Sequence, residues 1–139
     1  MEVIKLSVDF GLVVLIWMVQ LIIYPGFRYY EEKMFLRWHK HYAILISLIV
    51  GPLMIVQASI HIFELFYDYR ISNLATFFLI LGCWLITFLS AMPLHNKIDQ
   101  GVKVNKYVKK LVSVNRYRTF GWTSVYLISL SQYIFGIYA

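Results

Sequence analysis

The chain has 139 residues, of which 60% are hydrophobic and only 14% are charged, and its mean hydropathy is +0.68. A soluble domain of this size has too little interior to bury so much apolar surface, so the composition excludes an ordinary soluble fold and predicts an integral membrane protein. The formal net charge of +6 follows from membrane topology and attraction to anionic lipids, so it requires no nucleic-acid partner.

Four apolar segments are each long enough to cross a hydrocarbon core about 30 Å thick, which takes roughly 20 helical residues. The predicted spans cover residues 6–24, 42–66, 74–94 and 119–138. We therefore predict a single all-α domain over residues 1–139, an integral membrane four-helix bundle. The first span is expected to be permanent, because it has no basic start and no small-residue cleavage site and it carries Asp9, Trp17 and Gln20.

The basic residues are unevenly distributed between the connections. Eleven of the thirteen lysines and arginines lie in residues 25–41 and 95–118, and the other two are Lys5 and Arg70. The excess of lysine and arginine marks the cytoplasmic side of a membrane protein. We therefore predict a multi-pass protein of the cell inner (plasma) membrane with both termini outside the cytoplasm.

The two basic connections also carry apolar residues at helical spacing. In the first connection these residues are Phe27, Tyr30, Met34 and Trp38, and in the second they are Val104, Val108 and Leu111. Each pattern is typical of a short helix that lies in the headgroup layer with its lysines and arginines toward lipid phosphates. We therefore predict short interfacial helices in both connections and membrane lipids as partners.

Polar side chains recur along one face of each predicted span. Because the bilayer core holds no water, such faces turn toward other helices or toward a cavity. Asp9 is expected to lie within reach of His61 or Glu64, since an ionisable residue inside a span needs a partner. Pro52, near the middle of the second span, is expected to kink that helix. The single cysteine, Cys83, is expected to be a packing residue.

All four predicted spans bring hydrogen-bonding or titratable groups to the cytoplasmic end of the bundle. A histidine titrates near neutrality, an arginine beside it can hold an anion or polarise a carbonyl, and an asparagine can orient a substrate. We therefore predict a site in which His95 is the general acid or base, Arg118 stabilises an anion and Asn115 orients the substrate. The residues predicted to bind the ligand are Gln20, Tyr24, His39, His41, Asn96 and Trp122.

The four histidines leave haem and metal readings open. His39 or His41, together with His95, could hold one haem near the cytoplasmic side. His61 with Glu64 and Asp9 could hold a metal near the outer face. The sequence favours neither reading, so we predict no metal ligand and no cofactor.

Five short motifs carry a family resemblance. They are YPGF (24–27), FLRWH (35–39), GPLM (51–54), PLHNKI (93–98) and VNRYRTFGW (114–122). With them the chain resembles small bacterial four-span membrane proteins of unassigned role. More distantly, Pro-Leu-polar followed about twenty residues later by Asn-x-x-Arg-Thr is similar to the anthrone oxygenase-like family.

Members of that family with an assigned activity oxidise polycyclic anthrones to quinones with dioxygen, without a metal or flavin. The resemblance implies a site at Pro93, His95, Asn115, Arg118 and Trp122. The chain departs from the family at His95, where the family commonly has asparagine.

Two classes of function follow from the sequence. The first is an oxidoreductase or oxygenase that acts on a lipophilic ring compound or lipid entering from the inner leaflet. The alternative is a non-catalytic accessory subunit of a larger membrane complex, or a haem- or metal-binding membrane protein. The expected partners are accordingly membrane lipids, a lipophilic small molecule or another membrane protein.

Overall fold

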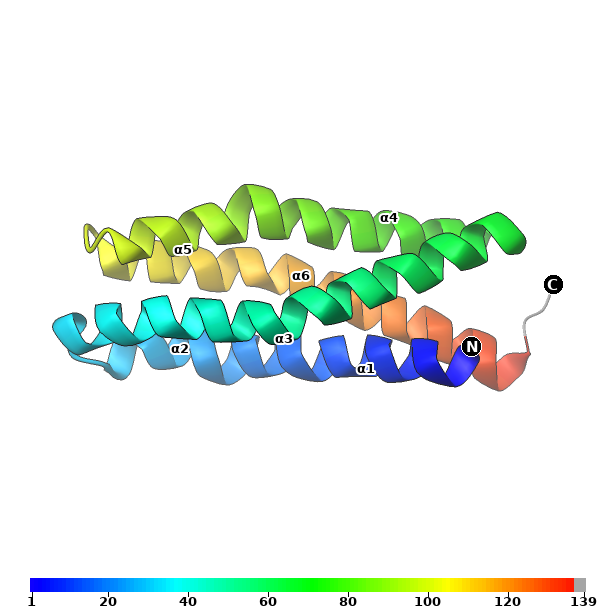
Figure 1. Ribbon diagram of the computed structural model, residues 1–139, viewed down its shortest axis with the longest axis horizontal. Helices are drawn as coiled ribbons and strands as arrows, with labels where there is room; N and C mark the ends of the chain where they lie inside the picture. Colours follow the sequence, from blue (N-terminus) through cyan, green and yellow to red (C-terminus); the bar gives the residue numbers. More distant parts are fainter. Residues whose placement is uncertain (137–139) are drawn as a thin grey trace.

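The computed structural model describes residues 1–136, which form an elongated bundle of helices running back and forth along one axis (Figure 1). The first arm contains α1 (Glu2–Met18), a π-helical turn η1 (Val19–Ile23), α2 (Tyr24–Gly26) and a 3₁₀ turn η2 (Phe27–Tyr29). The second arm is α3 (Glu32–Tyr67). The third contains α4 (Ile71–Ile86), a π-helical turn η3 (Thr87–Ala91) and α5 (Met92–Asp99), and the fourth is α6 (Val104–Phe135). The described residues are thus all-α, with no strand among them.

Three helical stretches are long and apolar enough to cross a membrane, namely Glu2–Tyr29, Glu32–Tyr67 and Ile71–Asp99. The remaining arm, α6, is 32 residues long but has five lysines and arginines in its first half. The predicted fourth span falls in its second half up to Phe135, and residues 137 and 138 of that span lie outside the described residues. The length and composition of these three stretches indicate a helical membrane protein.

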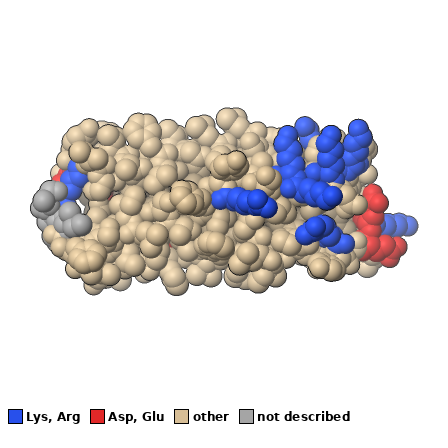
Figure 2. Space-filling model, turned by 180° about the vertical axis from the view of Figure 1, so that it is seen from behind, with Lys and Arg blue, Asp and Glu red and all other residues tan. Residues whose placement is uncertain are grey.

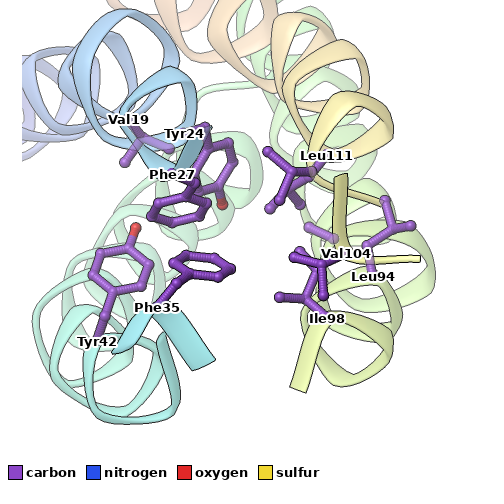
Figure 3. Packing of buried hydrophobic residues seen from close by; sticks show 11 residues of the cluster. Val19, Tyr24, Phe27, Phe35, Tyr42, Leu94, Ile98, Val104 and Leu111 are labelled. Carbon is purple, nitrogen blue, oxygen red and sulfur yellow. The ribbon is translucent and has the colours of Figure 1, made fainter. Parts of the chain in front are cut away.

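The two predicted interfacial helices are not separate elements. Residues 32–41 are the first turns of α3, and residues 104–118 are the first half of α6, each continuous with the helix that follows. Val104, Val108 and Leu111 are buried in the bundle core, where they pack with Phe27 and Phe35 of the opposite arms (Figure 3). The apolar face of this segment therefore meets other helices of the chain.

Each π-helical turn directly precedes a helix that has proline in its first turn. Pro25 follows η1 and Pro93 follows η3. Proline has no N–H, so the carbonyl four residues earlier loses its usual helical partner, and a wider turn accommodates this loss. The helix α5 continues past Pro93 to Asp99, whereas α2 ends one residue after Pro25; Tyr24 is buried and His95 is half-buried. Pro52 likewise lies inside α3, which bends about midway along its length (Figure 1).

The two ends of the bundle differ in charge. Lysines and arginines gather at one end, which we call the basic end (Figure 2). The lysines of the segments that meet there are Lys33, Lys40, Lys97, Lys103, Lys106, Lys109 and Lys110. The opposite end contains the start of α1 and the end of α3 (Figure 1). The basic end is the end that the sequence assigns to the cytoplasm.

A buried polar network fills the half of the bundle toward the opposite end. The Gln57 amide donates to Asp9 Oδ1 at 2.7 Å, and His61 Nε2 lies 3.2 Å from both Asp9 oxygens. Lys5, which is 3% exposed, donates to Glu64 at 3.0 Å. The expected contact between Asp9 and His61 is confirmed, whereas Glu64 pairs with Lys5 instead.

Close packing between α4 and α6 depends on Gly121. A Cβ at this position would lie 2.5 Å from Cys83 Sγ, so Gly121→Ala should destabilise the protein by about 1–3 kcal/mol through overpacking. Removing the sulfur in Cys83→Ala should make the same glycine substitution nearly neutral. Thermal unfolding of the two single variants and the double variant in detergent measures this coupling.

Gly82 provides the matched control for this prediction, because a Cβ there meets no atom within 4 Å. Gly82→Ala should leave the melting temperature unchanged or raise it. Equal effects at Gly82 and Gly121 would contradict the close approach of α4 and α6.

Candidate functional site

A cavity of about 330 Å³ opens between the helices of the bundle and is lined by residues from all four arms. Its lining is mostly apolar, with side chains such as Ile16, Val50 and Phe88. Polar groups line it as well, and these are Tyr24, Tyr42, Ser47, Thr87, His95, Asn96, Arg118 and Trp122. An apolar cavity with a few converging polar groups is the usual form of a small-molecule site, and this volume lies at the lower end of the common range.

Arg118 is the buried cation of this cavity, with a side chain that is 6% exposed. Its Nη1 donates to Asn115 Oδ1 at 3.1 Å, and its guanidinium lies 5.0 Å from the centroid of the Trp122 ring. Its Nε is buried and makes no hydrogen bond, and no carboxylate among residues 1–136 forms an ion pair with it. A buried charge is costly unless it is paired, so the arrangement is suited to an anionic or carbonyl oxygen in the cavity.

Asn115 holds the arginine and does not itself line the cavity. It lies three residues before Arg118 on α6, so the two side chains share one face of the helix. Its amide Nδ2 donates to Gln20 Oε1 at 3.0 Å, while its Oδ1 accepts from Arg118. Asn115 and Gln20 are therefore placed to orient the guanidinium, and not to contact a ligand.

His95 is joined to groups on two other arms. Its Nε2 lies 3.0 Å from the Tyr24 hydroxyl, and its Nδ1 lies 2.8 Å from Nε2 of His39. The other ring nitrogen of His39, Nδ1, lies 2.7 Å from Asp99 Oδ1. His95 and Tyr24 line the cavity, so these contacts connect the cavity wall with the basic end.

Aromatic rings enclose the middle of this connection. His39 is fully buried, and the ring centroids of Phe27 and Phe35 lie 5.5 Å and 5.3 Å from its own. Phe27 and Phe35 belong to the same buried cluster as Tyr42 (Figure 3). The His39 side of its contact with His95 is therefore surrounded by apolar rings.

The structure divides the predicted site residues into those that line the cavity, those that lie behind its wall, and one that does neither. Tyr24, His95, Asn96, Arg118 and Trp122 line the cavity. Gln20, Asn115 and His39 lie behind its wall and contact the lining residues or one another.

His41 corrects the predicted ligand-binding set. It is exposed and does not line the cavity. Two residues along a helix correspond to a rotation of about 200°, so burial of His39 turns His41 to the opposite side of α3.

Several polar residues of the site were not predicted, among them Ser47, Thr87, Asp99 and Tyr42. Asp99 lies four residues after His95, and Tyr42 lies three residues after His39, so each shares a helical face with a residue that was predicted. That spacing is the signal that could have identified Asp99 and Tyr42.

The candidate haem and metal ligands are mostly hydrogen-bonded to other side chains in the structure. His39 and His95 are hydrogen-bonded directly to each other, so their facing nitrogens do not flank a position for iron. Near the opposite end, Asp9 contacts His61 but Glu64 is paired with Lys5. Over residues 1–136 no three or more His, Cys, Asp or Glu side chains converge as metal ligands would.

Comparison of the chain with protein-family models, with curated proteins and with solved structures finds no match. The function of the site is therefore inferred from its own geometry. Two features distinguish it: a buried arginine with no carboxylate partner within residues 1–136, and a hydrogen-bonded chain from the cavity to the basic end.

Proposed function

We propose that the protein is a four-span protein of the cell inner membrane, with the basic end in the cytoplasm and both termini outside. Three helices that are apolar enough to cross a membrane support this proposal. The second half of α6 packs among them through buried residues such as Trp122 and Val125. Eleven of the thirteen lysines and arginines lie in the two connections assigned to the cytoplasm.

Reporter fusions test this topology. A fusion after Tyr69, between the second and third arms, and a fusion at Ala139 should both report the outer side. A fusion after Gly101, between α5 and α6, should report the cytoplasm. A cytoplasmic signal at Tyr69 or Ala139 would overturn the assignment.

In this membrane protein the cavity binds a lipophilic molecule that carries an anionic or carbonyl oxygen. The observation that carries the proposal is Arg118, which is buried at the cavity, has an unused Nε and has no carboxylate partner among the described residues. The apolar lining accommodates the body of the ligand, and the guanidinium binds its oxygen. Such a ligand would partition into the inner leaflet and enter from there.

The proposed chemistry is proton abstraction from a lipophilic ring compound or lipid, as the first step of an oxygenase-like oxidation. Tyr24 and His95 supply the proton acceptor at the cavity wall, and Arg118 stabilises the anion that forms. Dioxygen is the oxidant that the resemblance to the anthrone oxygenase-like family implies. Asn115 acts on the reaction by holding Arg118.

The test compares molecules bound to the purified protein and to two arginine variants. The protein, Arg118→Met and Arg116→Met are each extracted with organic solvent, and the extracts are analysed by mass spectrometry. An acidic or carbonyl-bearing lipophile should be enriched with the unchanged protein and with Arg116→Met, because Arg116 is exposed. It should be depleted with Arg118→Met, and identical extracts from all three would contradict the proposal.

A further inference from the structure

Four side chains form a continuous hydrogen-bonded chain between the cavity and the basic end. They are Tyr24, His95, His39 and Asp99, joined by contacts of 3.0, 2.8 and 2.7 Å. Tyr24 is 3% exposed and His39 is 0% exposed, whereas the side chain of Asp99 is 26% exposed. This hydrogen-bonded chain therefore begins at the cavity, passes through the protein interior and reaches solvent at Asp99.

Every hydrogen bond in this hydrogen-bonded chain is donated in the same direction, from Tyr24 toward Asp99. A carboxylate only accepts hydrogen bonds, so Asp99 receives the Nδ1 proton of His39, and His39 Nε2 is left as an acceptor. With neutral imidazoles, His95 must then donate from Nδ1 to His39, and its Nε2 accepts from the Tyr24 hydroxyl. Each hydrogen consequently has an acceptor directly ahead of it.

We infer that Tyr24, His95, His39 and Asp99 form a proton relay that carries a proton from a ligand in the cavity to solvent at the basic end. The inference rests on the proposed function, because the ligand supplies the proton. As an acidic O–H or C–H bond of the ligand breaks, its proton joins the Tyr24 oxygen, and the Tyr24 proton moves to His95 Nε2. The Nδ1 proton of His95 moves to His39 Nε2, and the Nδ1 proton of His39 moves to Asp99, which releases it to water.

The charges around the relay favour this direction. His95 faces Tyr24 of the first arm, His39 and Tyr42 of α3, and Arg118 of α6, which lines the same cavity. The guanidinium disfavours a positive charge on His95, and the Asp99 carboxylate attracts the proton from the far side. The electron pair stays on the ligand as an anion beside Arg118. Reprotonation of the product along the same path restores the starting tautomers.

Nuclear magnetic resonance of the ¹⁵N-histidine-labelled protein tests the direction of the relay without any ligand. His39 and His95 should both be protonated at Nδ1 and bare at Nε2. Asp99→Asn should disturb this pattern at His39, whereas Glu31→Gln, which neutralises an exposed carboxylate, should preserve it. A proton on Nε2 of His95 in the unchanged protein would overturn the relay.

Fluorescence of 2-naphthol tests the transfer itself, since this lipophilic phenol becomes a strong acid when excited. Bound to the unchanged protein it should emit as naphtholate, and the emission should be slower to form in D₂O. His39→Gln keeps an amide in place of the imidazole but cannot pass a proton, and Asp99→Asn removes the final acceptor. Both variants should lower naphtholate emission several-fold, whereas Asp99→Glu and Glu31→Gln should retain it.

The two experiments separate failure of the relay from failure of the proposed function. Full naphtholate emission from probe bound to His39→Gln and Asp99→Asn would refute the relay and leave ligand binding intact. Failure of 2-naphthol to bind, followed by its fluorescence anisotropy, would count against the proposed function. In that case the histidine tautomers decide whether the relay is present.

Discussion

Replacing Arg118 with methionine should weaken anion binding in the cavity strongly while leaving the protein about as stable as before. The guanidinium is buried without a carboxylate partner among the described residues, so folding bears its desolvation cost. An apolar side chain of similar volume removes this desolvation cost, and the gain offsets the loss of the hydrogen bond to Asn115. A charged hydrogen bond to the ligand contributes about 1.5–3 kcal/mol, so its loss should weaken binding roughly 10- to 150-fold.

The measurement pairs binding of 2-naphthoate, a lipophilic carboxylate, with thermal unfolding in detergent. Arg116→Met is the matched control, because it removes the same charge from an exposed position two residues earlier on α6. It should leave both binding and melting temperature nearly unchanged. If Arg118→Met instead lowers stability by several kcal/mol and spares naphthoate binding, the arginine is a structural clasp and not a ligand group.

The all-helical fold and its membrane-spanning character could be predicted from hydropathy, but the continuity of the helices could not. The apolar surface of a stripe such as Val104, Val108 and Leu111 can be buried either at the headgroup layer or against neighbouring helices. Sequence alone does not decide between these surroundings. In the structure no glycine or proline interrupts residues 104–118, so the segment extends α6 and its stripe joins the core.

The proximity of His95, Arg118 and Tyr24 to one cavity could also be predicted, because the three residues lie at corresponding ends of their segments. Their contacts could not, since these depend on how each helix is rotated about its axis. The π-helical turns before Pro25 and Pro93 alter that rotation by inserting a wider turn, and periodicity of 3.6 does not include them. The burial of Lys5 could not be predicted either. Its charge suggests exposure, but it is buried in the structure, where it forms an ion pair with Glu64.

Replacing Asp9 with alanine should be the most damaging single change in the polar network near the opposite end. It leaves the Gln57 amide and His61 Nε2 without their acceptor in the bundle interior, where little water can replace it. An unsatisfied buried polar group costs about 1–3 kcal/mol, so we expect a loss of about 2–4 kcal/mol in unfolding free energy. Asp9→Asn keeps an oxygen toward Gln57 and should lose about 1 kcal/mol or less.

Unfolding in detergent measures these differences, with Asp68→Ala as the control. Asp68 is half exposed and pairs with Arg70 at the surface, where such pairs contribute little. Its loss should shift the melting temperature only slightly. Equal stability of Asp9→Ala and Asp68→Ala would mean that the interior around Asp9 is hydrated and that the network is not a structural element.

Asp9→Ala should also weaken ligand binding in the cavity, because Gln57 connects Asp9 with the residues around Arg118. Its amide donates to Asp9, and its Oε1 accepts from Trp122 Nε1 at 3.0 Å; the Trp122 ring in turn faces the Arg118 guanidinium. Without Asp9, Gln57 is free to turn away, and the indole loses the contact that fixes it beneath the arginine. Asp9→Ala should therefore weaken naphthoate binding in the unchanged background and have no further effect in Arg118→Met, a non-additivity expected only of coupled sites.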